Sequence, residues 1–139
     1  MKIERELIID APVDVVWSVM SDVERWPEMT ASMTSVRLLD GELRLGARAE
    51  VVQPKLPKAI WTVTRWDEGR RFDWTARSAG LTTVGIHGVE ATTGGTRAYI
   101  GAEQTGFLAP LLALLIGKLS EGYLDLEIAG FRDRSLAIR

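Results

Sequence analysis

A single long helix is the dominant prediction from the C-terminal stretch, residues 106–139. The stretch opens with ten apolar residues at positions 107–116 and then becomes amphipathic. Proline is tolerated only in the first turn of a helix, so Pro110 places the start of the helix near Ala109. A helix that runs from there to Ala137 would be roughly 42 Å long, at about 1.5 Å per residue.

The second half of this helix has an apolar face made of residues spaced three and four positions apart, and the charged residues fall mostly on the other face. The apolar face comprises Leu119, Tyr123, Leu126, Ala129 and Gly130. A helix of this length needs a large surface to pack on, because its apolar face must be removed from water. The sequence therefore predicts a curved antiparallel sheet beneath the helix.

The apolar run at residues 107–116 has a second interpretation, a membrane segment. Crossing a bilayer takes about 20 apolar residues, whereas this run is only ten residues long and contains a proline. The sequence therefore predicts no stable membrane insertion. A helix that lies on a membrane surface remains an alternative to a helix that is covered by the core.

Composition and motifs narrow the classes of function. With 139 residues the chain is expected to form one domain over residues 1–139, and a net charge of −2 with mixed signs gives no support to a nucleic-acid partner. One histidine and no cysteine argue against a metal site, thiol catalysis and disulfides. No glycine-rich loop joins a strand to a helix, so no cofactor is predicted. The charged N-terminus, residues 1–6, lacks an apolar signal region, and a cytoplasmic protein is expected.

The remaining chain is predicted to be mostly strand. One strand is expected at residues 2–9, followed by a helix that starts at Asp10-Ala11-Pro12 and a very short helix from Asp22 to Trp26-Pro27. From residue 34 the apolar period is two, which predicts strands at 34–40, 46–53, 58–67, 70–78, 82–92 and 96–105. Because turn-rich separators between these strands are short, the strands are antiparallel neighbours. Seven strands and one long helix give an α+β fold.

Several short motifs follow one another along the whole chain. They are Ala11-Pro12-x-x-x-Val16-Trp17, Asp22-x-x-x-Trp26-Pro27, Leu45-Gly46-Ala47-Arg48, Gln53-Pro54, Trp61-x-Val63, Trp74, His87-x-Val89-Glu90 and Gly95-Thr96-Arg97. Their order resembles the superfamily of START domains, the birch-pollen-allergen fold and the polyketide cyclase/dehydrase family, often called SRPBCC. The resemblance implies a helix-grip fold, in which a seven-stranded curved antiparallel sheet wraps around the long C-terminal helix.

The resemblance also implies a deep cavity between sheet and helix, usually holding an apolar or aromatic small molecule. Members of the superfamily include lipid carriers, hormone receptors, aromatase/cyclases and chaperone activators. The fold therefore does not imply one chemistry.

His87 is the only histidine and lies in the middle of a predicted strand, in the pattern Thr83-x-Gly85-x-His87-x-Val89. If these residues face the cavity, the imidazole could bind a ligand carbonyl or phenol, or transfer a proton near neutral pH. The alternative is a structural histidine that is bonded to a neighbouring strand or to water.

Tryptophan and small residues allow two interpretations each. Trp61 and Trp74 could form the wall of an aromatic pocket or simply fill the core. Small residues in the last two strands leave room for a ligand or for the helix, or permit sharp curvature of the sheet; they are Gly85, Gly88, Ala91, Ala98, Gly101 and Ala102. Gly117, Gly122 and Gly130 in the long helix suggest close packing or a mobile segment at a cavity entrance.

Three functions remain open, and the preferred one is binding of a hydrophobic or aromatic small molecule that is lipid- or polyketide-like, by a monomer or a dimer. The residues expected to line the cavity are Trp61, Val63, Trp74, His87, Val89, Ile100, Leu112, Leu115, Leu119 and Tyr123. The second function is a cofactor-independent cyclase/dehydratase or isomerase that uses His87 as its acid/base. The third is a protein-interaction module with a filled cavity and a large exposed apolar patch.

Overall fold

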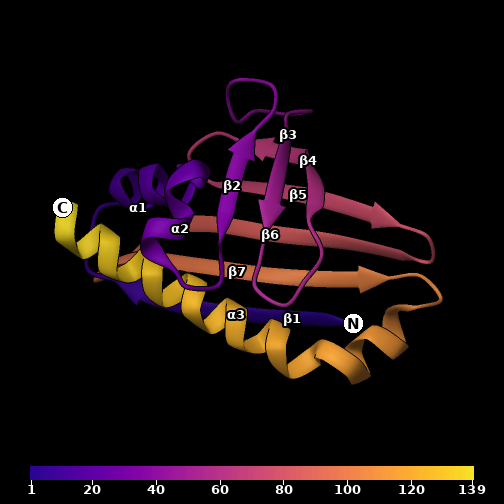
Figure 1. Ribbon diagram of the computed structural model, residues 1–139. Coiled ribbons are helices and arrows are strands. Elements are labelled where there is room, and N and C mark those ends of the chain that lie inside the picture. Colours follow the sequence, from indigo (N-terminus) through magenta and orange to yellow (C-terminus); the bar gives the residue numbers. More distant parts are fainter.

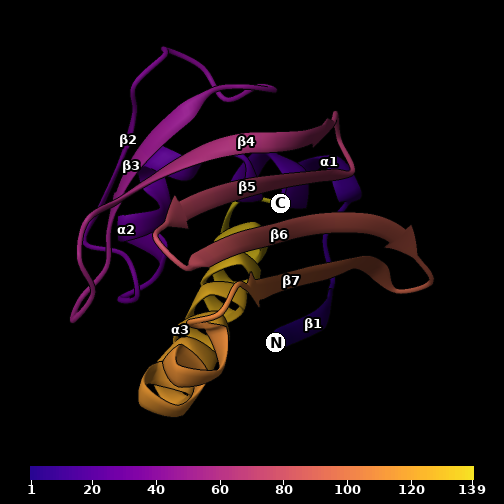
Figure 2. The same ribbon diagram turned by 90° about the vertical axis from the view of Figure 1, so that its right-hand side faces the viewer.

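A curved antiparallel sheet wraps around one long helix, and two shorter helices cover one end of the sheet (Figures 1 and 2). The computed structural model describes residues 1–139. The elements in chain order are β1 (Lys2–Ile9), α1 (Val13–Met20), the 3₁₀ turn η1 (Val23–Arg25), α2 (Trp26–Met29), β2 (Ser35–Leu38), β3 (Arg48–Val52), β4 (Ala59–Asp67), β5 (Arg71–Ser78), β6 (Leu81–Thr92), β7 (Gly95–Thr105) and α3 (Ala109–Ile138). The predicted α+β helix-grip fold is confirmed.

The strand order β1-β7-β6-β5-β4-β3-β2 places the first and the last strand side by side. β1 pairs with β7 from Lys2 opposite Glu103 to Ile9 opposite Thr96. The other pairs are hairpin neighbours, as their short connections predicted. Since α3 leaves β7 and returns across β1 and β7, it lies against the concave side of the sheet (Figure 2).

All seven predicted strands are present, within a few residues of their predicted ends. The predicted end of the short helix at Trp26-Pro27 is wrong, because η1 leads into α2 and α2 continues to Met29. Pro27 lies in the first turn of α2, where its missing N–H leaves no helical hydrogen bond unmade. Trp26 thereby enters the core, where it is fully buried.

The predicted apolar face of α3 is rotated relative to the buried one. The buried residues in the second half of α3 are Leu124, Glu127, Ile128, Gly130, Phe131 and Ser135, whereas Leu126 is exposed. Gly130 belongs to both sets. The difference arises because the sequence places a glutamate and a serine on the buried stripe, which makes the apolar periodicity of the helix misleading.

The first turns of α3 are only partly covered, so the expectation of a covered helix is wrong for this segment. Leu111, Leu114 and Leu115 are exposed, and so is Phe107 just before the helix. Pro110 lies in the first turn, as predicted. No helix of the protein has the length and apolar composition needed to cross a membrane.

Two glycines of α3 give a test of how closely α2 packs on it. Gly130→Ala should destabilise the protein by about 1–3 kcal/mol, because a Cβ at this position would collide with the carbonyl oxygen of Met29, a backbone atom of α2. Gly122→Ala is the matched control. It should stabilise the protein by up to about 1 kcal/mol, since a Cβ there meets no atom within 4 Å and alanine is the better helix former. Unfolding in urea measures both values, and a Gly130→Ala protein as stable as the wild type would contradict the close packing.

Candidate functional site

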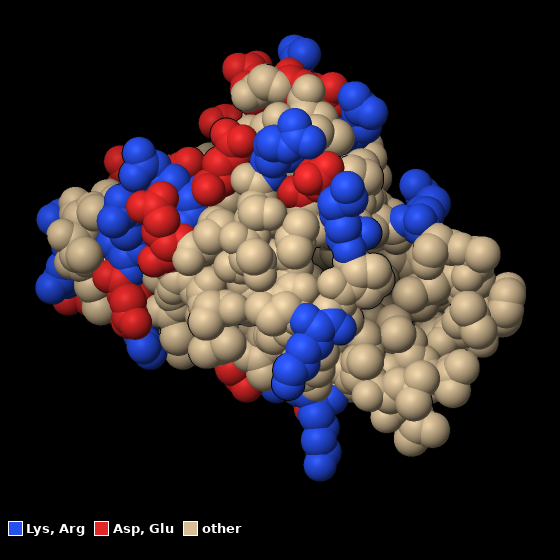
Figure 3. Space-filling view, in the orientation of Figure 1, with Lys and Arg blue, Asp and Glu red and all other residues tan.

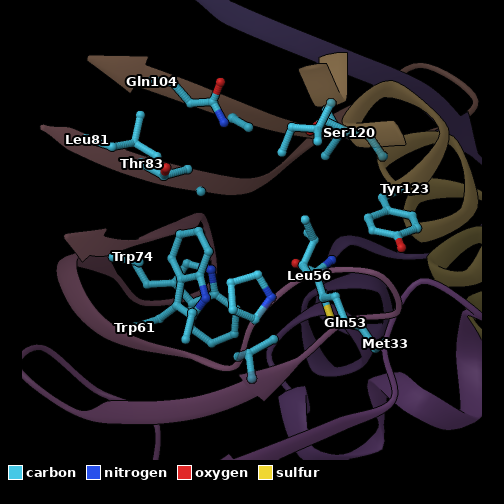
Figure 4. A pocket seen from close by; sticks show the side chains of 18 of the residues that line it. Met33, Gln53, Leu56, Trp61, Trp74, Leu81, Thr83, Gln104, Ser120 and Tyr123 are labelled. Atoms are coloured by element: carbon cyan, nitrogen blue, oxygen red, sulfur yellow. The ribbon is translucent and has the colours of Figure 1, made fainter. Parts of the chain in front are cut away.

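A cavity of about 470 Å³ lies between α3 and the concave face of the sheet. Its volume falls within the range of roughly 300–1,000 Å³ that is typical of small-molecule sites. The strands contribute Trp61 of β4, Trp74 of β5, Thr83 of β6 and Gln104 of β7, while Ser120 and Tyr123 face them from α3 (Figure 4). Leu56 and Gln53 in the connection between β3 and β4 close one side, together with Met33 (Figure 4).

Aromatic rings form one wall of the cavity. The ring centroids of Trp61 and Trp74 are 5.8 Å apart, and Trp74 in turn packs edge-on against Trp26 at 5.2 Å. Gly85, opposite Trp74 on β6, is required by this packing, because a Cβ there would come within 2.9 Å of the indole ring of Trp74. The small residue at position 85 therefore accommodates a core tryptophan. Gly88 has a comparable role, since its Cβ would collide with the ring of Tyr99.

His87 lies in the cavity wall and is buried in the same aromatic cluster. Its ring stacks on Phe72 with 4.4 Å between centroids, and its Nδ1 lies 3.3 Å from the Phe72 carbonyl oxygen. A carbonyl oxygen only accepts hydrogen bonds, so Nδ1 carries the proton and Nε2 keeps a free lone pair. Burial lowers the pKa of His87 from 6.5 to about 4, which makes the ring neutral at pH 7. His87 is thus a hydrogen-bond acceptor and a weak base.

Glu127 of α3 is a second titratable group in the cavity wall, and it is buried as well. Burial raises the pKa of its carboxyl group from 4.5 to about 8, and no hydrogen bond or nearby charge offsets this effect. At pH 7 the carboxyl group is therefore mostly protonated and can donate a hydrogen bond. The cavity thus contains one neutral donor on α3 and one neutral acceptor on β6.

Further polar groups line the cavity between these two. The side-chain Oε1 of Gln104 is buried and has no hydrogen-bond partner. The amide of Gln53 donates to the Ser32 carbonyl oxygen at 3.4 Å. The hydroxyl group of Tyr123 donates to the Pro54 carbonyl oxygen, which ties α3 to the connection between β3 and β4. Gln104 Oε1 is therefore an unpaired acceptor inside the cavity wall, whereas the hydroxyl group of Tyr123 holds α3 against the connection between β3 and β4.

The structure brings together five of the ten residues that the sequence suggested for the cavity. Trp61, Trp74, His87, Leu112 and Tyr123 lie in its wall. The other five lie elsewhere: Val63, Val89 and Ile100 are buried in the core, Leu119 is half-buried outside the cavity wall, and Leu115 is exposed. Contact of any of the ten with a ligand stays a prediction.

The strand residues outside the cavity share the inward orientation of those inside it. Val89 follows His87 by two positions on β6, but there α1 packs against β6 and fills the space. Leu115 and Leu119 are displaced by the rotation of α3. Alternation along a strand thus predicted which residues share a face, whereas neither the inward face nor the point at which the core ends and the cavity begins was predictable.

Glu127 was not among the predicted site residues, although the sequence contains a signal for it. It follows Leu124 by three positions and precedes Phe131 by four, which places a carboxyl group on the same helix face as two core side chains. A charged residue type at such a position is a site candidate, because carboxyl groups are almost never fully buried without a partner.

The pH dependence of stability should identify His87 and Glu127. Between pH 4.5 and 6.5, unfolding releases one proton from Glu127 and adds one to His87, so stability is nearly constant. From pH 6.5 to about 8 only the release from Glu127 remains, since His87 is then neutral in both states. The unfolding free energy should therefore fall by about 1.4 kcal/mol per pH unit in this window.

Glu127→Gln should remove the fall above pH 6.5 and leave only the contribution of His87, so that stability rises up to pH 6.5 and is then constant. Urea unfolding across this pH range measures the slopes. Glu121→Gln, an exposed position of the same helix, is the control and should follow the wild type. A wild-type stability that stays constant above pH 6.5 would contradict a protonated Glu127.

Comparison with known proteins finds one matching family model and proteins of similar sequence. The model of a family described as "Polyketide cyclase / dehydrase and lipid transport" matches residues 1–135. A protein of Streptomyces halstedii named "Putative polyketide cyclase" is 35% identical over 91 residues, which cover 63% of this chain and 72% of that protein.

Solved structures match over nearly the whole chain. A hypothetical protein of Helicobacter pylori superposes with a TM-score of 0.84 at 15% identity, covering 97% of this chain and 88% of the other. Norcoclaurine synthase of Thalictrum flavum, in complex with dopamine and hydroxybenzaldehyde, superposes with a TM-score of 0.76 at 15% identity, covering 100% of this chain and 88% of the other. At these identities the structural likeness supports the fold alone.

Proposed function

The chain belongs to the polyketide cyclase/dehydrase and lipid-transport family, and on this premise we propose that it binds a hydrophobic or aromatic small molecule in the cavity between the sheet and α3. The observation that carries the proposal is the cavity itself, which is walled by Trp61 and Trp74 and lined more by apolar than by polar residues. Burial of a ligand's apolar surface contributes about 25 cal/mol per Å² to binding.

The polar groups narrow the class of ligand. No charged group acts on Glu127, so a carboxylate or an ammonium group beside it would be buried without compensation. The other two charged side chains that line the cavity, Lys58 and Arg77, are both basic. A neutral molecule with a carbonyl oxygen and a hydroxyl group suits the site better. Its carbonyl oxygen would accept from the Glu127 carboxyl group, and its hydroxyl group would donate to His87 Nε2.

Ligand binding is tested by native mass spectrometry of the purified protein, followed by titration with fatty acids, sterols and hydroxylated aromatic ketones. The expected result is a bound species of a few hundred daltons, or a preference for the neutral aromatic ketones. Thr83→Trp, whose side chain would fill the cavity, should weaken this binding at least about tenfold. Thr82→Trp on the outward side of the same strand is the control and should bind normally. Equal binding by Thr83→Trp and the wild type would place the ligand outside the cavity.

The pKa of Glu127 favours a second candidate function, acid–base catalysis such as cyclisation, dehydration or isomerisation. A general acid is most effective when its pKa lies near the working pH, and burial raises the pKa of Glu127 to about 8. His87, which the sequence suggested as the acid/base, fits this role less well than Glu127, because a pKa of about 4 leaves its ring a weak base at neutral pH. In this hypothesis Glu127 is the acid and His87 accepts a hydrogen bond from the substrate.

Glu127→Gln separates binding from catalysis, since the amide keeps a hydrogen-bond donor but cannot transfer a proton. If the protein is a carrier, Glu127→Gln should change its affinity for the bound molecule by less than about threefold and should have no other effect. In an enzyme, turnover of that molecule should fall at least about 100-fold. Turnover that is unchanged in Glu127→Gln would remove this residue from the catalytic hypothesis.

A further inference from the structure

The cavity mouth is bordered by an apolar patch that no other part of the protein covers. The patch consists of Phe107, Leu111, Leu114 and Leu115, whose exposed fractions are 81%, 52%, 82% and 69%. They lie at the start of α3. Single exposed leucines are ordinary on protein surfaces, but a cluster of large apolar side chains on one helix segment marks an interaction site.

This patch is continuous with the cavity. On the inner side of the same helix turns, Leu112 and Ile116 line the cavity. The start of α3 is therefore apolar on both of its sides, one toward the cavity and one toward solvent. Whatever covers the patch also borders the route by which a ligand reaches the cavity.

Three of the chain segments that line the cavity carry charges of one sign. They are 53–61, 74–83 and 104–120, here called the mouth segments, and they hold four basic residues and no acidic residue. These are Lys55, Lys58, Arg77 and Lys118. The mouth segments thus carry a net charge of +4, and the rest of the chain carries −6, because the whole chain has a net charge of −2. Only Lys58 has an acidic neighbour, Glu50 at 3.8 Å.

The same asymmetry is visible on the surface. At the end of the molecule where α3 begins, the surface is uncharged with basic groups at its margin, while acidic groups, mixed with basic ones, lie toward the opposite end and the top of this face (Figure 3). An uncharged apolar surface with a basic border fits an anionic bilayer, in which apolar side chains enter the headgroup region and lysines meet lipid phosphates. A second copy of the chain fits less well, because pairing this face with itself would bring the basic borders together.

We propose that the protein docks reversibly on anionic membrane surfaces through the start of α3, with the cavity mouth facing the lipid. The inference builds on the proposed ligand-binding function and assigns the ligand to a class that partitions into the bilayer. In the docked state a hydrophobic molecule passes between lipid and cavity along Leu112 and Ile116 without crossing open water.

The test is flotation of the full chain with vesicles of phosphatidylcholine, either alone or mixed with phosphatidylserine. Binding is expected on the mixed vesicles, and it should weaken steeply with added salt. The double variant Leu114→Ser/Leu115→Ser should bind the mixed vesicles at least about tenfold more weakly than the wild type. Both side chains are exposed, so the variant should fold normally. Its control is Ile8→Ser/Leu45→Ser, which removes two exposed apolar side chains elsewhere and should bind like the wild type.

Two double variants that reverse charges test the role of the basic residues in the mouth segments. Lys55→Glu/Lys118→Glu should reduce binding to the mixed vesicles and flatten its salt dependence, whereas Arg44→Glu/Arg65→Glu, the same charge change outside the mouth segments, should have a much smaller effect. Equal losses in the two double variants, or no binding of the wild type to mixed vesicles, would overturn the proposal. So would sedimentation of the wild type as a dimer that Leu114→Ser/Leu115→Ser converts to a monomer, because the patch would then belong to a second copy.

Ligand binding measured without vesicles keeps the two proposals apart. A protein that binds a molecule in its cavity but never binds mixed vesicles refutes the docking surface alone. A protein that binds mixed vesicles through α3 while its cavity accepts no ligand refutes the proposed cavity function alone.

Discussion

The packing of Trp26 decides where the core of this protein ends. Trp26 is fully buried in α2, and its ring meets both the sheet and the long helix: Trp74 and His87 on the sheet at 5.2 Å each, and Phe131 on α3 at 5.4 Å. Its ring N–H donates to the Met20 carbonyl oxygen at the end of α1. Because one rigid side chain joins these elements, it sets the distance between α3 and the sheet at this end of the molecule. No comparable side chain lies between the other half of α3 and the strands, and the cavity occupies that space.

The same packing determines the electrostatics of the cavity. Aromatic neighbours exclude water from His87, and burial among apolar side chains does the same for Glu127, so both groups are uncharged near neutral pH. An uncharged polar group without a hydrogen-bond partner costs stability in a core. Glu127 and the Nε2 atom of His87 have no such partner and belong to residues that line the cavity, which is the arrangement expected of a binding site rather than of a core. The cavity is thus suited to selection by hydrogen bonding rather than by charge.

The two halves of α3 have different surroundings, although they form one continuous helix. The second half is held by Phe131 and Ile128 in the core and by the close contact of Gly130 with α2. The first half extends past this packing and exposes leucines beside the cavity mouth. A helix that is anchored at one end and apolar at the other connects ligand binding to whatever surface the mouth meets. The proposed membrane docking and the proposed ligand cavity therefore share one structural element.

Local rules in the sequence determined the strands, the hairpins and the start of α3. An apolar period of two, turn residues between the strands and Pro110 act through neighbours in the chain, so each can be recognised without a structure. The length and apolar face of the helix predicted a curved sheet beneath it, the family resemblance implied the same arrangement, and the fold confirmed it. Which residues of a strand share a face was predictable for the same reason, since it follows from alternation alone, but which of the two faces points inward was not.

Only the tertiary structure decided which inward residues meet empty space. Val89 and His87 share one face of β6, yet α1 covers the first and the cavity borders the second. The rotation of α3, and with it the burial of Glu127 and the exposure of Leu115, depends on contacts with α2 and with β1, which are remote in sequence. Burial is a property of what packs against a residue from elsewhere in the chain, and the pKa of a buried group follows from burial. For that reason the chemistry of the site emerged only when the distant segments were seen together.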